Sequence, residues 1–191
     1  MKTYKKFVTE KKGDTVVFTF GRFNPPTVGH EKLITAVQSV ARTRGGDFFV
    51  YPSHSQDPKK NPLNQATKIK YMKKMFPKFK KNIIASSGKT ALNIAAELYK
   101  KKYTTLVMVV GSDRVDEFQR ILDKYNGQDL AHGFYDFDQI YVVSAGERDP
   151  DAEGVEGMSA SKMRAAAVAG DFKSFRMGTP KALSDSDTKQ L

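Results

Sequence analysis

Short apolar runs alternate with longer amphipathic segments along this chain. The apolar runs are rich in β-branched and aromatic residues and predict strands at 15–20, 47–52, 82–86, 104–110 and 139–145. Apolar residues at helical spacing predict helices near 29–43, 63–76, 89–102, 114–124 and 159–169. Strands that alternate with helices are typical of an α/β protein, so we expect a three-layer sandwich around a mainly parallel, five-stranded sheet.

The same pattern divides the 191 residues into one domain with two flanks. Residues 1–14 read as a basic N-terminal extension, and residues 15–180 carry the alternating pattern. Residues 181–191 read as a polar C-terminal tail that is frayed.

Composition narrows the functional classes. With 39% hydrophobic residues and no long apolar run, we expect a globular protein without a membrane span. The basic N-terminus lacks the apolar segment of a secretory signal, so a cytoplasmic setting is the default. The chain has no cysteine, and its three histidines lie in different segments, so we predict no metal site built from protein side chains.

The formal net charge is +11, and much of it is concentrated in residues 58–81, which hold nine lysines and no acid. Ile69, Met72 and Phe76 recur there at helical spacing, which indicates an amphipathic helix with a solvated basic face. A surface that attracts nucleotide phosphates or nucleic acid is the alternative. Nucleic acid is the less favoured partner, because the few aromatic residues nearby are expected in the core.

Loops at the carboxyl ends of parallel strands are where such sheets bind ligands. The strand pattern places four loops there, at 21–28, 52–61, 111–114 and 146–158. The last loop is acidic and long enough for a mobile flap, although it could equally be an ordinary surface loop. We therefore look for the site in these loops.

The stretch FTFGRFNPPTVGH, residues 18–30, has the composition of an anion-binding loop. Gly21 lets the backbone leave the strand tightly, so that the amides of Arg22 and Phe23 can face an anion. We expect Thr27 to cap the following helix, and Gly29 to leave space over its first turn. His30 then lies near a helix N-terminus, where its ring can donate a hydrogen bond to a phosphate oxygen.

This stretch resembles the GxFxPx[HT]xGH signature of the nucleotidylyltransferase superfamily. Its members include mononucleotide adenylyltransferases, phosphopantetheine adenylyltransferase and the cytidylyltransferases. Thr27 stands where many members have a histidine, and Asn24 replaces a frequent aspartate. The resemblance implies the Rossmann-like fold that this superfamily shares with class I aminoacyl-tRNA synthetases. It also implies nucleotide-binding roles for Gly21, Arg22, Phe23, Asn24, Thr27 and Gly29, and a catalytic role for His30.

A second block, GMSASKMRAAAVAGDF at 157–172, resembles the superfamily's ISSTxIR segment, with Ala160 in place of a usual serine or threonine. Hydroxyls and free amides at a helix start suit phosphate, and an arginine one turn later can grip it with a planar fork. The resemblance implies that Ser159, Ser161 and Arg164 hold the phosphates that leave.

Two weaker blocks complete the expected site. TLVMVVGSD at 105–113 resembles the strand and loop that the superfamily places by the base and ribose, with Gly111 and Asp113 at its end. Asp113 could accept from a ribose hydroxyl, or simply cap the helix that starts near Arg114. The 53–63 segment resembles a variable loop that often brings a lysine to substrate phosphates, and Lys59 and Lys60 are the candidates.

The reaction that the resemblance implies is attack by an acceptor phosphate on the α-phosphorus of a nucleoside triphosphate, with Mg²⁺ held mostly by substrate and water. ATP is favoured by the VVGSD segment, whereas EGMSASK also resembles the EGISTTK of cytidylyltransferases. Asn24, Thr27 and Ala160 permit an alternative, a catalytically silent nucleotide-binding or assembly module on the same fold. The acceptor, a phosphorylated small molecule, is not revealed, and a homo-oligomer is an open alternative to a monomer.

Overall fold

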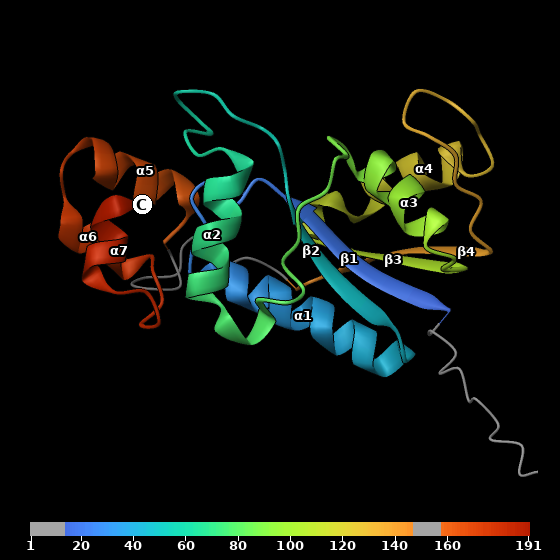
Figure 1. Cartoon of the computed structure of the whole chain (residues 1–191), viewed down its shortest axis with the longest axis horizontal. Coiled ribbons are helices and arrows are strands. Elements are labelled where there is room, and N and C mark those ends of the chain that lie inside the picture. Colours follow the sequence, from blue (N-terminus) through green and yellow to red (C-terminus); the bar gives the residue numbers. More distant parts are fainter. Residues whose placement is uncertain (1–13, 147–157) are drawn as a thin grey trace, which may run out of the picture.

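A computed structural model describes residues 14–146 and 158–191 (Figure 1). Its sheet has four strands in the order β2-β1-β3-β4, and every neighbouring pair is parallel. The strands are β1 (Thr15–Gly21), β2 (Asp47–Pro52), β3 (Thr105–Val110) and β4 (Gln139–Ser144). The predicted N-terminal extension, apart from Asp14, and most of the predicted flap lie outside the described residues.

The predicted fifth strand, at 82–86, does not form. Ile83 makes a single parallel bridge to Val50, in which the Val50 amide donates to the Asn82 carbonyl at 2.9 Å and the Ile84 amide donates to the Val50 carbonyl at 3.1 Å. The Asn82 side-chain amide donates to the Phe48 carbonyl at 3.0 Å. The Asn82 side chain thus donates a hydrogen bond to the edge of β2, at a position where a longer neighbouring strand would have used a backbone amide.

All five predicted helices are present, and two more follow them. The described helices are α1 (Gly29–Arg44), α2 (Gln65–Met75), α3 (Ala91–Lys100), α4 (Val115–Tyr125), α5 (Ala160–Val168), α6 (Phe172–Met177) and α7 (Asp185–Gln190), with short 3₁₀ turns at Pro77–Phe79 and Ser112–Arg114. Within the described ranges, no helix is long and apolar enough to cross a membrane.

The sheet is covered on both faces, as the three-layer prediction required (Figure 1). Val16 and Phe18 of β1 pack on one face with Ile94 of α3. Val17, which points the other way, packs with Val37 of α1. This alternation along β1 follows from the two-residue repeat of a strand, and it confirms a Rossmann-like α/β fold.

The last residues are folded, so the prediction of a frayed tail at 181–191 is wrong. Leu183 is fully buried in a cluster with Phe23 of the β1 loop and Met72 of α2. Lys74 of α2 forms an ion pair with Asp187 of α7 at 2.5 Å. One apolar side chain anchors an otherwise polar segment, and α5, α6 and α7 gather beyond α2 at one end of the molecule (Figure 1).

Candidate active site

The chain reverses its direction across the sheet between β1 and β3, and the loops that leave these two strands flank the switch point. The β1 loop leaves at Gly21, where an added Cβ would stand 3.1 Å from the Phe23 ring. Phe23 has a left-handed backbone with φ 45°, and its ring lies 4.8 Å from that of His30, between centroids. A larger residue at position 21 would have to displace the Phe23 ring, which packs against His30. Within the described residues, the amides of Arg22 and Phe23 make no hydrogen bond, which fits the predicted anion cradle.

His30 is held in one orientation by the loop that precedes it. The Thr27 amide donates to Nδ1 of His30 at 2.8 Å, and the Thr27 hydroxyl lies 3.0 Å from the same nitrogen. Because Nδ1 accepts, the neutral ring carries its proton on Nε2. The side chain is 9% exposed, so a buried imidazole presents an Nε2–H donor at the start of α1.

Thr27 does not cap α1 as predicted. The N-cap is Val28, whose side chain makes no capping bond, and the Val28 amide donates to the Gly178 carbonyl at 2.8 Å. Thr27 is used instead to fix His30. At Gly29 an added Cβ would meet only the Thr27 hydroxyl, at 3.6 Å, so the first turn of α1 is open as expected.

Asn24 ties the β1 loop to the loop after β2. Its side-chain amide donates to the Leu63 carbonyl at 2.9 Å, and its side-chain oxygen accepts from the Leu63 amide at 3.0 Å. A carboxylate at this position could only accept, so it would lose one of the two bonds. This gives a physical reason for asparagine where the superfamily often has aspartate, and the Asn24 side chain is engaged with protein rather than directed to a ligand.

Arg164 joins the two strongest motifs, although 140 positions separate it from its partner in the β1 loop. One guanidinium nitrogen donates to the Asn24 carbonyl at 2.6 Å, and another donates to the Ser161 hydroxyl at 3.0 Å. Ser159 caps α5, since its hydroxyl accepts from the Lys162 amide at 3.2 Å. An arginine offers five N–H donors in a fixed fork, so the half-buried Arg164 keeps donors for a ligand.

The two candidate lysines of the 53–64 loop lie on a tight turn. The Asp57 carboxylate accepts from the amides of Lys59 at 3.1 Å and Lys60 at 2.7 Å, and from the Asn61 side chain at 2.5 Å. These hydrogen bonds, of which the one from the Lys60 amide has the largest effect, hold the pKa of Asp57 below its usual value. The side chains of Lys59 and Lys60 are exposed at the tip of this turn.

Lys68 contradicts the prediction of a wholly solvated lysine face on α2. Its side chain is fully buried, and Nζ donates to the carbonyls of Ser53 at 2.5 Å and Ser55 at 3.2 Å. Burial lowers its pKa to about 8. The burial of Lys68 could have been predicted from the helical repeat. Residue 68 shares a helix face with Tyr71, Met72 and Met75, which are all buried.

The lowered pKa of Lys68 gives a pH-dependent contribution to stability. The unfolded chain holds its proton up to about pH 10.5 and the folded chain only to about pH 8, so stability rises with pH between these values. We expect the difference in unfolding free energy between the wild type and Lys68→Met to shift in favour of the wild type from pH 8 to pH 10. Urea denaturation of both proteins at several pH values measures it, and a difference that is constant with pH would contradict the burial of a titrating ammonium.

Gly111 and Asp113 lie where β3 ends. Asp113 is exposed, and neither the 3₁₀ turn nor α4 has a side-chain cap, so the capping alternative is wrong. A Cβ at Gly111 would stand 2.8 Å from a carboxylate oxygen of Asp113. Glycine therefore allows Asp113 to take its position beside the switch point.

Gly111→Ala is expected to displace the Asp113 carboxylate and weaken triphosphate binding, with an unchanged melting temperature. Each side-chain change alone, Gly111→Ala or Asp113→Ala, should raise the KM for the triphosphate about fivefold to tenfold, the effect of one net hydrogen bond. Steady-state kinetics of the double variant test the mechanism. If both substitutions act through the Asp113 carboxylate, the KM of the double variant should be no higher than that of Asp113→Ala alone. Additive effects would show that Gly111 acts by another route.

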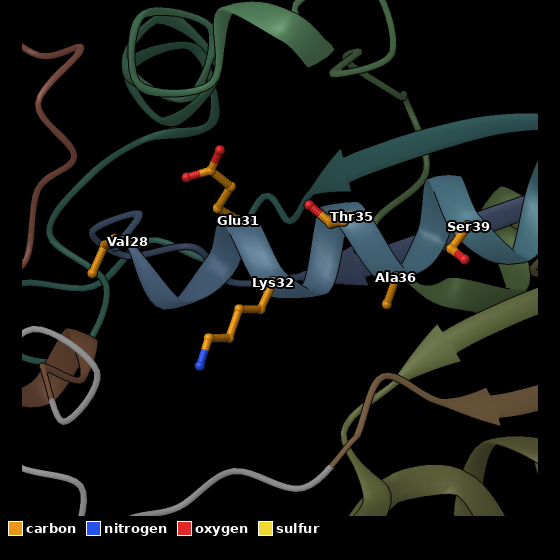
Figure 2. Close-up of a pocket in the computed structure, with 6 residues that line it drawn as sticks. All are labelled: Val28, Glu31, Lys32, Thr35, Ala36 and Ser39. Atoms are coloured by element: carbon orange, nitrogen blue, oxygen red, sulfur yellow. The ribbon is translucent and has the colours of Figure 1, made fainter.

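A hollow of about 510 Å³ runs along one side of α1 from Val28 to Ser39 (Figure 2). Its described lining comes from the helix and its N-cap, with Glu31 and Lys32 near the start. None of the predicted site residues is among the described residues that line it. In the part of the chain that the structure describes, no three histidine, aspartate or glutamate side chains are grouped so that they could hold a metal ion.

The fold places the chain among the α/β proteins with a parallel sheet that bind ligands at the switch point. A buried histidine and an arginine that is hydrogen-bonded to the β1 loop lie beside this switch point. The family model described as cytidylyltransferase-like matches residues 18–166, which include the whole of the first motif and residues 157–166 of the second. The chain belongs to this cytidylyltransferase-like family, and its enzyme class is nucleotidyltransferase.

Among solved structures, the chain is similar to a protein of Vibrio parahaemolyticus that carries the provisional name nicotinate-nucleotide adenylyltransferase. The TM-score is 0.54 at 15% sequence identity, and the match covers 92% of this chain and 97% of the other. At this identity the match concerns the fold. No curated protein matches the sequence significantly.

Proposed function

We propose that the protein moves a nucleoside monophosphate, AMP in preference to CMP, from a nucleoside triphosphate to a phosphorylated small-molecule acceptor. The observation that carries the proposal is the bond from Arg164 to the Asn24 carbonyl, which brings the second motif to the loop that orients His30. Both groups suit phosphate: a planar cationic fork and a fixed imidazole donor.

In this reaction an acceptor phosphate oxygen forms a bond to the α-phosphorus, and the bond between that phosphorus and the pyrophosphate oxygen breaks. His30 donates from Nε2 to an α-phosphate or bridging oxygen as negative charge grows. Arg164, with Ser159 and Ser161, holds the leaving pyrophosphate. Lys59, or its neighbour Lys60, neutralises the acceptor phosphate. Such transfers depend on positioning and charge neutralisation rather than on covalent help from the protein.

Magnesium fits this scheme as part of the bound triphosphate. The described site is rich in cationic and neutral donors, so it complements phosphate oxygens rather than a cation. Mg²⁺, when bound, supplies further neutralisation of the phosphates, and it is held there by substrate and water. The chain's own part is then to orient the two phosphate groups in line.

The preference for ATP rests on the resemblance of the VVGSD segment to mononucleotide adenylyltransferases. The exposed Asp113 carboxylate at the end of this segment suits a ribose hydroxyl, which ATP and CTP share. The structural neighbour is named for adenylyl transfer, whereas the family model is named for cytidylyl transfer. The base is therefore left to direct measurement.

Pyrophosphate release tests the proposal. The protein is incubated with Mg²⁺ and each of ATP, CTP, GTP and UTP, against a pool of phosphorylated metabolites, with His30→Ala alongside. We expect release that requires one triphosphate, the pool and His30. No release from the folded wild type, together with retained triphosphate binding, would favour a catalytically silent binding module.

A further inference from the structure

A lysine that is fully buried without a carboxylate is costly to the fold. Moving an ammonium out of water carries a large desolvation penalty, which is usually offset by an ion pair. Within the described residues, Lys68 has no carboxylate partner, and its two acceptors are the carbonyls of Ser53 and Ser55. These carbonyls belong to the 53–64 loop, which carries Lys59 and Lys60.

Packing alone does not account for this side chain. Methionine would fill a similar volume without the cost of a buried charge, but it would leave both carbonyls without a donor. The Ser53 hydroxyl, which is buried, makes no hydrogen bond in the described structure, so it does not hold this end of the loop. The Lys68 ammonium donates hydrogen bonds to the backbone carbonyls of Ser53 and Ser55, which point toward it.

The 53–64 loop is held at its start and at its end. At its start, the Ser53 amide donates to the Gly21 carbonyl at 2.8 Å and the His54 ring lies 2.7 Å from the Ser86 carbonyl, while Lys68 of α2 holds the carbonyls of Ser53 and Ser55. Asn24 of the β1 loop holds its end through both backbone groups of Leu63. Between these ties, the Asp57 turn sets the backbone of the two lysines. The direction in which Lys59 and Lys60 project thus depends on both anchors.

We propose that Lys68 is a positioning residue that holds the 53–64 loop in the shape that presents Lys59 and Lys60 to the acceptor phosphate. The inference rests on the proposed function for the role of these two lysines. It assigns Lys68 no contact with either substrate. Its loss should therefore affect use of the acceptor and leave binding of the triphosphate unchanged.

The test compares Lys68→Met with Lys73→Met, which removes the same charge from an exposed position on the same helix. Amide hydrogen exchange, followed by mass spectrometry, reports on the loop without any substrate. We expect exchange across residues 53–63 to quicken about tenfold or more in Lys68→Met, with the sheet and α2 unchanged, and to stay at the wild-type rate in Lys73→Met. Equal exchange of the loop in all three proteins would overturn the inference.

Kinetics separate positioning from a general loss of structure. With the phosphorylated-metabolite pool as acceptor, we expect the half-saturating pool concentration to rise about tenfold in Lys68→Met, while that of the triphosphate stays constant, as expected when one charge-assisted tie is lost. Lys68→Arg, which keeps charge and donors, should recover part of the effect. Equal changes for both substrates would overturn the inference.

Two outcomes are kept apart by this design. If the wild type releases no pyrophosphate, the proposed function fails, and hydrogen exchange still decides whether Lys68 holds the loop. If Lys68→Met does not fold, as judged by circular dichroism, Lys68→Gln takes its place, because its amide retains N–H donors but is too short to reach both carbonyls. The same faster loop exchange is expected of it, and exchange at the wild-type rate would again contradict the inference.

Discussion

His30→Ala is expected to lower the turnover number about 10²–10³-fold, on the order of 3–4 kcal/mol, while the protein stays folded. The buried ring presents its Nε2–H from an orientation fixed by the Thr27 amide, so it costs no reorganisation as charge develops on the phosphate. The measurement is pyrophosphate release under saturating triphosphate, with a thermal melt to confirm folding.

His30→Asn is the matched control for loop support. The asparagine oxygen can accept from the Thr27 amide much as Nδ1 does, but the side chain has no donor at the place of Nε2. We expect it to be as slow as the alanine variant, although its loop is better held. Turnover near the wild-type value in either variant would remove His30 from the chemistry.

Arg164→Ala is expected to weaken binding of the triphosphate about 10–100-fold, the range of charge-assisted hydrogen bonds. The variant loses both the donors for phosphate and the tie to the Asn24 carbonyl. Isothermal titration with each triphosphate measures the change in Kd.

Arg164→Lys separates these two contributions, because it keeps the charge and loses the fork. We expect its affinity to lie between those of the alanine variant and the wild type. Arg120→Ala, at an exposed position on α4, controls for the loss of one positive charge and should bind as the wild type does. A triphosphate affinity that is the same in Arg164→Ala and in the wild type would exclude Arg164 from the phosphate site.

The sheet and its helices were predictable because each strand and helix carries its own hydrophobic repeat. The failures occur where one tertiary contact decides the outcome. Asn82 satisfies the β2 edge with its side chain, so an apolar run that looks like a strand makes only one bridge. Leu183 is the buried residue of a polar segment, and no periodicity shows what a single leucine will contact.

The candidate site also has features that the sequence predicts and features that depend on tertiary contacts. The motifs point to His30 and Arg164, and the structure brings the second motif to the loop that holds His30. The sequence does not show that Asn24 binds the backbone of Leu63, or that Thr27 fixes His30 instead of capping a helix. These are contacts of backbone groups, and a pattern of side chains carries no information on where a loop's carbonyls point.

The burial of Leu183 has a consequence for the order of events during synthesis. The residues that it covers, Phe23 among them, leave the ribosome long before it does, and Ile83 precedes it by roughly 5–20 s at typical elongation rates. Until then the nascent chain must keep an incomplete apolar surface beside the unfinished nucleotide site. Arg164 emerges within the same late interval, so its bond to the Asn24 carbonyl and the burial of Leu183 both belong to the last stage of folding.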